Sequence, residues 1–116
     1  MIYQGDMQRV IQIAARVTGV HANLLTGDKK NREISHARFI AMKAVREATG
    51  KSYPDIGMAF RRDHTTVVHG VRRASQIIED HRDAADNFHS IMVMAATSRT
   101  NPSYVVSDQI DRSALV

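Results

Sequence analysis

Apolar residues recur at steps of three and four along most of this chain, and this spacing constrains the fold more than any other feature of the sequence. An amphipathic helix gathers such residues on one face, whereas a half-buried strand requires strict alternation, which persists nowhere here. In the first segment the stripe consists of Met7, Val10, Ile11, Ala14 and Val17. The sequence therefore predicts an all-α fold, a compact bundle of about five to six helices.

Capping and stopping residues indicate where the first helices begin and end. We expect Asp6 to cap the first helix and Gly19 to end it. A short helical turn is expected over 21–25. The strongest helix is predicted over 35–49, which is rich in good helix formers, and Gly50 should stop it.

Two further helices are expected in quick succession. Ser52 is a suitable N-cap for a short helix over 53–60, in which Pro54 occupies the first turn. Asp63 is a suitable N-cap for a longer helix that runs to about residue 81. A short helix joined by a tight turn to a longer one is the pattern of a helix-turn-helix.

The last part of the sequence is less regular. Asp83 is expected to cap a final helix, and the apolar pattern fades from Ser98. We therefore divide the chain into a helical domain, residues 1–97, and a tail, residues 98–116, that is flexible or ordered only by a partner. The apolar residues of the final helix and the tail leave a homodimer or a protein partner open.

Composition excludes several classes of function. The chain has 116 residues, which is enough for one domain, and it contains no Cys, so disulfides, zinc-thiolate sites and thiol catalysis are ruled out. No run approaches the ~18 apolar residues of a membrane span. The histidines are scattered, and no catalytic pairing stands out. We expect a cytoplasmic protein that is not an enzyme and carries no metal or cofactor.

Charge is concentrated in the middle of the chain. Between Asp28 and Arg73 there are 11 basic and 5 acidic residues, whereas the remainder is slightly acidic. Such a field attracts a polyanion, although a charged run is equally typical of a solvated face. The basic loop over 28–33 and the turn Arg61-Arg62 both lie in this middle part.

The first turn of the helix after Arg62 carries residues that can read DNA bases. Asp63, His64, Thr65 and Thr66 are small or flat polar residues that donate or accept hydrogen bonds, as base edges in the major groove require. Taken singly, each of these residues is better explained as an N-cap or an ordinary first-turn residue, and only the combination with Arg61 and Arg62 favours base reading.

These residues resemble the C-terminal DNA-binding domain of the bacterial replication initiator DnaA. The segment Arg62-Asp63-His64-Thr65-Thr66-Val67, with His69 two residues later, matches that family's signature. Upstream positions agree in order and spacing: Ala37-Arg38, Ala41-Met42, Arg46-Glu47, Thr49, Ser52, Ile56-Gly57 and Phe60. The resemblance covers about residues 10–78 and implies the TrpR-like helix-turn-helix fold of DnaA domain IV.

The resemblance also implies roles for the matching residues. Asp63, His64 and Thr65 would read bases in the major groove, and Lys30 would enter the minor groove. The DNA backbone would be contacted by Lys29, Arg32, Arg38, Arg46, Tyr53, Pro54, Arg61, Arg62, Thr66 and His69.

Three departures from the family pattern bear on these roles. The family's Phe-Gly-Gly-Arg-Asp-His is Phe60-Arg61-Arg62-Asp63-His64 here, one residue shorter and without glycine, so a different angle between the two helices is open. Lys30 stands where an arginine is usual, which favours relaxed A·T selectivity. Tyr53 replaces a small aliphatic residue and adds a ring near the DNA.

The resemblance and the residues together define an expected function. The sequence contains no Gly-x-x-x-x-Gly-Lys-Ser/Thr loop, so ATP binding of the initiator's kind is not expected. We expect sequence-specific binding of double-stranded DNA at DnaA-box-like sites in a bacterial nucleoid, by a host or phage protein, with an effect on replication initiation or transcription. The alternative is a protein-interaction adaptor that retains the fold. RNA binding is disfavoured because few aromatic residues are available for stacking.

Overall fold

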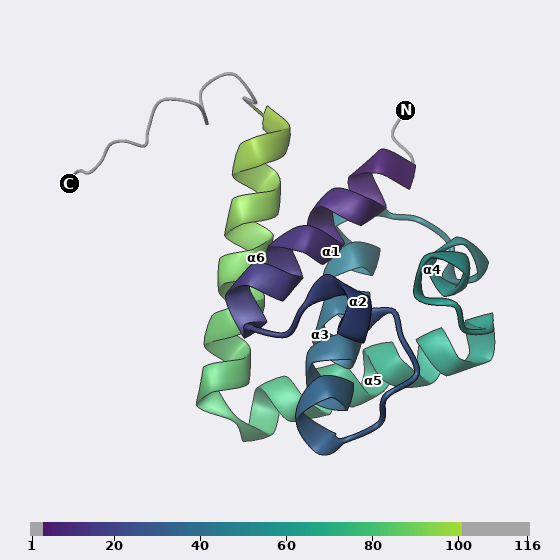
Figure 1. The fold of residues 1–116 in the computed structure, drawn as a ribbon. Helices are drawn as coiled ribbons and strands as arrows, with labels where there is room; N and C mark the ends of the chain where they lie inside the picture. Colours follow the sequence, from purple (N-terminus) through teal and green to yellow (C-terminus); the bar gives the residue numbers. More distant parts are fainter. Residues whose placement is uncertain (1–3, 101–116) are drawn as a thin grey trace.

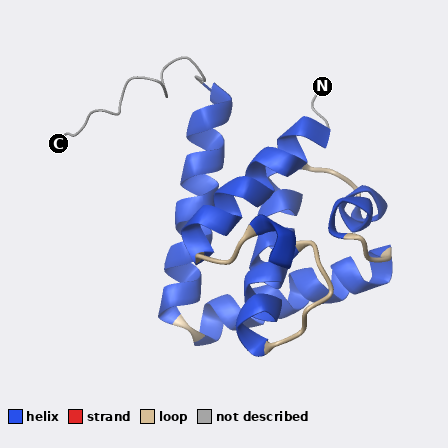
Figure 2. Ribbon diagram, in the orientation of Figure 1, coloured by secondary structure: helices blue, strands red, loops and turns tan. Residues whose placement is uncertain are grey.

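Helices joined by short loops make up the part of the chain that the computed structural model describes, residues 4–100, with side chains described for 6–97 (Figure 1, Figure 2). The helices are α1 (Gln4–Thr18), α2 (Ala22–Leu25), α3 (Arg32–Thr49), α4 (Tyr53–Phe60), α5 (His64–Asp80) and α6 (Arg82–Thr100). The predicted all-α fold is confirmed, and none of these helices is long and apolar enough to cross a bilayer.

Helix α3 lies at the centre of the bundle and contacts every other helix described (Figure 1). Helix α6 packs against α1, α3 and α5, and α4 packs against α5 at the far end of the molecule from α6. One continuous core joins them, and it includes Val10, Met42, Val45, Phe60 and Val67, all without measurable exposure. The α4–α5 pair is therefore anchored in the main core.

Close packing of α3 on α5 depends on a glycine. A Cβ atom at Gly70 would lie 2.7 Å from the Met42 sulfur and 2.9 Å from Cδ1 of Phe39. Both distances are shorter than van der Waals contact, so α5 approaches α3 closely because this position lacks a side chain.

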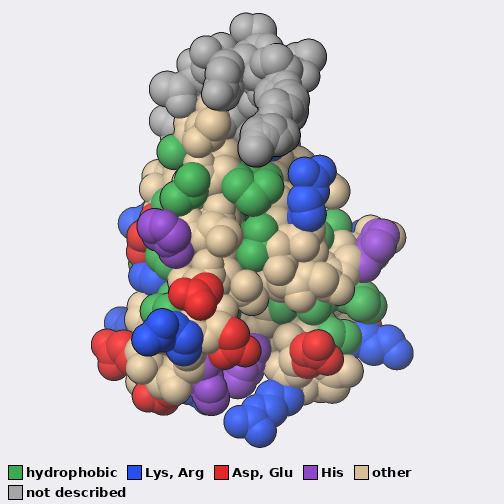
Figure 3. All heavy atoms as spheres, turned by 90° about the vertical axis from the view of Figure 1, so that its left-hand side faces the viewer, with side chains coloured by type: hydrophobic (Ala, Val, Ile, Leu, Met, Phe, Trp, Pro, Cys, Tyr) green, Lys and Arg blue, Asp and Glu red, His purple; other side chains and the backbone are tan. Residues whose placement is uncertain are grey.

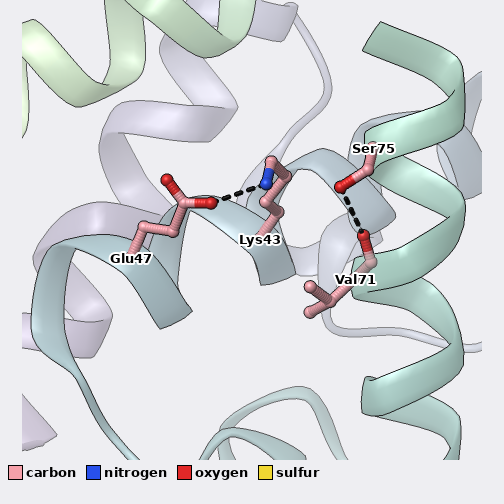
Figure 4. A network of polar contacts seen from close by, with 4 residues as sticks. All are labelled: Lys43, Glu47, Val71 and Ser75. Atoms are coloured by element: carbon pink, nitrogen blue, oxygen red, sulfur yellow. Dashed lines mark hydrogen bonds and ion pairs between the residues drawn. The ribbon is translucent and has the colours of Figure 1, made fainter. Parts of the chain in front are cut away.

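Lys43 on α3 and Ser75 on α5 each make a polar contact within their own helix. Lys43 pairs with Glu47 one turn later on α3, and the Ser75 hydroxyl donates to the Val71 carbonyl on α5 (Figure 4). The Lys43 ammonium also lies 5.2 Å above the ring of Phe88 on α6. Lys43 is thus balanced by an acid and contributes little to the basic surface.

The predicted helix ends are confirmed at two glycines and wrong at two aspartates. Gly19 and Gly50 follow α1 and α3 with positive φ of 77° and 70°. However, α1 begins at Gln4 and α6 at Arg82, so Asp6 and Asp83 lie inside the first turns and cap neither helix. An acidic residue stabilises a helix through the helix dipole both at the N-cap and within the first turn, so the sequence does not distinguish these two positions.

The end of α6 also differs from the prediction. The helix continues to Thr100, although the apolar pattern fades at residue 98. Residues 98–100 of the predicted tail thus belong to α6. Residues 101–116 lie outside the described residues, and the division at 97/98 stays a prediction.

Candidate nucleic-acid interface

The turn between α4 and α5 closes without the expected glycine. Arg61 takes the left-handed conformation there, with φ 60°. Its amide donates to the Met58 carbonyl at 3.3 Å, and the Arg62 amide donates to the Gly57 carbonyl at 2.8 Å. This is the hydrogen-bond pattern of a Schellman motif, with an arginine at the position that glycine usually takes.

Gly57 makes this tight turn possible. A Cβ atom there would lie 2.3 Å from the Arg62 carbonyl oxygen, a distance that no real Cβ contact adopts. The backbone of the turn therefore folds directly over α4. Ser52, the predicted N-cap of α4, accepts from the Asp55 amide at 3.2 Å, so both ends of this short helix are fixed.

The first turn of α5 projects into solvent. Asp63, His64, Thr65 and Thr66 are all exposed, whereas the next residue, Val67, is fully buried. The Asp63 carboxylate accepts from the Thr66 amide at 3.0 Å and caps the helix, as predicted. This bond, then the Thr66 hydroxyl and the nearby His64, hold the pKa of Asp63 below its ordinary value.

The loop between α2 and α3 presents part of the predicted cationic surface. Lys29, Lys30 and Arg32 are exposed, with Arg32 in the first turn of α3 and the two lysines in the loop. Asn31 caps α3 by accepting from the Ile34 amide at 3.0 Å. The loop and the start of α3 therefore offer three positive charges to solvent.

Arg38 points inward, and its predicted contact with the DNA backbone is corrected. It is 3% exposed. Its guanidinium donates to the carbonyls of four residues before it in the chain: Leu24, Leu25, Gly27 and Lys29, at 2.8–3.2 Å. Burial and the charge of Arg62 lower the pKa of Arg38, and Asp28 opposes them. Arg38 supports the basic loop from beneath.

Arg46 and Tyr53 form a stacked pair at the junction of α3 and α4. The guanidinium carbon lies 4.3 Å from the centre of the Tyr53 ring, and one nitrogen donates to the Lys51 carbonyl at 2.6 Å. Both side chains are half-buried, whereas Pro54 beside them is exposed. The ring that departs from the family pattern thus has a partner within the chain.

The two arginines of the turn differ in environment. Arg61 is exposed. Arg62 is half-buried, and its guanidinium donates to the Phe60 carbonyl and to the Gly27 carbonyl, both at 2.7 Å. The structure therefore turns Arg62 toward the loop that holds Lys29 and Lys30. His69, also assigned to the DNA backbone, is exposed beside the edge of Phe39, at 6.4 Å between ring centres.

Sequence reasoning missed the inward role of Arg38, although a signal was present. Arg38 lies four residues after Ile34 and four before Met42, both of which are buried. It therefore belongs to the core-facing stripe of α3. A charged residue on a buried stripe requires polar partners nearby, and carbonyls of the preceding loop supply them.

The face formed by α6 differs from the α4–α5 end. Apolar side chains lie along its upper part, and acidic, basic and histidine side chains mix in its lower part (Figure 3). Within residues 6–97 no three metal-binding side chains come together. The loop and the turn, by contrast, expose Lys29, Lys30, Arg32 and Arg61, and the exposed polar tip of α5 directly follows the turn.

The comparisons with known proteins agree with this geometry. Residues 7–74 match the family described as bacterial dnaA protein helix-turn-helix. The chromosomal replication initiator protein DnaA of Neisseria meningitidis (strain FAM18) is 31% identical over 86 residues, which are 73% of this chain and 17% of that protein. The DnaA protein of Picosynechococcus (strain PCC 7002) is 44% identical over 70 residues, 60% of this chain and 16% of the relative.

A third relative, the DnaA protein of Tropheryma whipplei (strain Twist), is 35% identical over 86 residues, 74% of this chain and 18% of its own length. The chain thus spans less than one fifth of the length of these relatives. The family match runs from α1 through the loop and α4 into α5, and on these grounds the chain belongs to the bacterial DnaA helix-turn-helix family.

Proposed function

We propose that this chain binds double-stranded DNA sequence-specifically, with the tip of α5 in the major groove and the loop before α3 against the adjacent minor groove. The observation that carries the proposal is the exposure of Asp63, His64, Thr65 and Thr66 immediately before the buried Val67. Because these polar residues are exposed while Val67 fixes the helix in the core, the tip can enter a DNA groove without a rearrangement of the protein.

The chemistry of the tip suits base edges. A carboxylate has several lone pairs, so Asp63 can cap α5 and still accept from a cytosine amino group. Thr65 offers a hydroxyl to a base or a methyl group to thymine, and His64 offers a ring nitrogen. Thr66, next to the free amide groups at the helix N-terminus, suits a phosphate.

The DNA backbone would be held by exposed residues around the tip and the loop. These are Lys29, Arg32, Pro54, Arg61, Thr66 and His69, with the stacked pair of Arg46 and Tyr53 at the DNA edge. Lys30 would enter the minor groove, where an ammonium gives weaker A·T preference than a guanidinium.

The sites bound would resemble DnaA boxes. A chain that occupies such sites, with no phosphate-binding loop in its sequence, would act on replication initiation or transcription by competing for them or marking them.

Selection of binding sites from random duplexes with the purified chain tests this function. We expect an enriched, asymmetric box, and an affinity that falls with salt by roughly 0.9 log units per log unit of salt for each phosphate contact. A failure to enrich any sequence, with no salt dependence, would refute the proposal and leave the protein-interaction adaptor.

A further inference from the structure

The basic loop and the α4–α5 turn are joined by hydrogen bonds to a single carbonyl. The Gly27 carbonyl accepts from Arg62 at 2.7 Å and from Arg38 at 3.2 Å. Arg62 lies 35 residues further along the chain, so this bond links two segments that approach each other only in the folded protein.

Apolar packing does not fill this junction. A cavity of about 360 Å³ separates the loop from the turn, and it is lined by Thr26, Gly27, Asp28, Arg61 and Arg62. The hydrogen bond that crosses from the loop to the α4–α5 turn is the one from the Arg62 guanidinium to the Gly27 carbonyl, whereas Arg38 holds the loop on α3.

Arg62 also fixes its own end of the link. Its second nitrogen donates to the Phe60 carbonyl at the end of α4, at 2.7 Å. The planar guanidinium spans two carbonyls at once, which a lysine ammonium at the same position cannot reproduce in the same geometry. On the loop side, Arg38 holds carbonyls on both sides of Gly27, in Leu25 and Lys29.

We infer that Arg62 is a positioning residue that couples the minor-groove loop to the recognition helix, so that the contribution of Lys30 to DNA affinity depends on the link from Arg62 to Gly27. This inference rests on the proposed DNA binding. The inference gives Arg62 this positioning role in place of the direct phosphate contact expected from the sequence, because two of its guanidinium nitrogens already donate to carbonyls.

A double-mutant cycle in the full chain tests the coupling on the selected duplex. The variants are Lys30→Ala, Arg62→Lys and their combination, and Arg61→Ala is the matched control because it removes a neighbouring charge that makes no such link. We expect Lys30→Ala to raise the Kd by a larger factor in the wild type than in the Arg62→Lys background. The two factors should differ by about threefold or more. The Arg61→Ala background should leave the effect of Lys30→Ala unchanged.

The conservative variant separates positioning from phosphate contact. If Arg62 bound phosphate directly, Arg62→Lys would keep most of the affinity and the salt slope, and its effect would add to that of Lys30→Ala. If the effects of Lys30→Ala and Arg62→Lys on the binding free energy add, so that the Kd of the double variant lies within about twofold of the additive value, the inference is overturned.

A measurement on the free protein keeps this test independent of DNA binding. Backbone ¹⁵N relaxation of residues 28–31 should show greater mobility in Arg62→Lys than in the wild type or in Arg61→Ala. Unchanged mobility would overturn the inference even if the proposed function holds. If no duplex binds while the loop does loosen, the proposed function alone fails.

Discussion

At the scale of single residues, the α4–α5 turn places an arginine where the backbone favours glycine. Arg61 has φ 60°, a conformation that is unfavourable for residues with a Cβ atom. Its side chain is exposed, so its charge is available for the contact with DNA that we propose.

Arg61→Gly should therefore separate stability from affinity. We expect the free energy of unfolding to rise by about 0.5–1 kcal/mol, since relief of the left-handed strain exceeds the added entropy of a glycine in the unfolded chain. DNA affinity should fall, with a salt slope lower by about one. Urea unfolding and binding at two salt concentrations measure both quantities. A variant that is less stable, or that binds with an unchanged slope, would contradict this reading of the turn.

Thr65 and Thr66 are adjacent and exposed but should behave differently. Thr65→Ala should cost on the order of 1–3 kcal/mol on the selected box and little on random DNA, because a base contact is lost. Thr66→Ala serves as the matched control and should weaken binding to both duplexes about equally. Competition binding measures the affinity of both variants for the selected box and for random DNA. If Thr65→Ala lost the same affinity on both duplexes, Thr65 would not read a base.

At the scale of elements, α4 is short and depends on its ends. Ser52 caps the first turn, and the Gly57 carbonyl accepts from the Arg62 amide where the chain folds back. Phe60 and Ile56 bury its inner face. Pro54 and Met58 are exposed on its outer side. With both ends fixed and its inner face buried, α4 sets the orientation of α5.

Gly57→Ala should disrupt this orientation. The added Cβ would lie 2.3 Å from the backbone oxygen of Arg62, which cannot move without opening the turn. We expect a loss of about 1–3 kcal/mol in the free energy of unfolding, as for overpacked sites, together with weaker specific DNA binding. Chemical denaturation measures the loss. The control is Met58→Ala on the exposed side of α4, with a change within about 0.5 kcal/mol; equal effects at both positions would be inconsistent with the close approach.

At the scale of the whole molecule, the α4–α5 end, which we propose binds DNA, lies far from α6. Where α5 meets α6, the rings of His36 and His81 lie 6.3 Å apart. Burial, then the charges of Arg32, Arg73 and His81, lower the pKa of His36 below its ordinary value of 6.5. Glu33 and Asp83 line the same pocket as His36, but burial and the three basic groups outweigh them.

The fold should lose stability in mild acid for this reason. Because the pKa of His36 is depressed in the folded state, the stabilisation is complete above the unfolded value near 6.5 and is lost as the pH falls below it. We expect thermal stability to decline between about pH 7.5 and about pH 5.5, and less steeply in His36→Gln. His89→Gln, an exposed position on α6, is the control. An identical pH profile for the wild type and His36→Gln would exclude this origin.

The sequence by itself determined the helices, their glycine stops and the caps at Ser52 and Asp63, because these depend on contacts within one helical turn. It also indicated the polar tip of α5, since exposure there follows from the helical spacing of Val67 and the residues after it. The first residues of α1 and α6 were missed because an aspartate is favourable at several positions of a first turn. The start of α3 was also missed: it begins at Arg32, capped by Asn31, inside the segment expected to be a loop.

Only the tertiary structure decided how the arginines are used. The spacing along α3 can show that Arg38 points inward, but the partners of Arg38, Arg46 and Arg62 cannot be read from the sequence. In the fold, Arg38 on α3 donates to loop carbonyls, Arg46 stacks on Tyr53 and Arg62 reaches Gly27. The direction of a long side chain is set by carbonyls and rings brought near by packing of distant segments, and local sequence spacing carries no record of those neighbours.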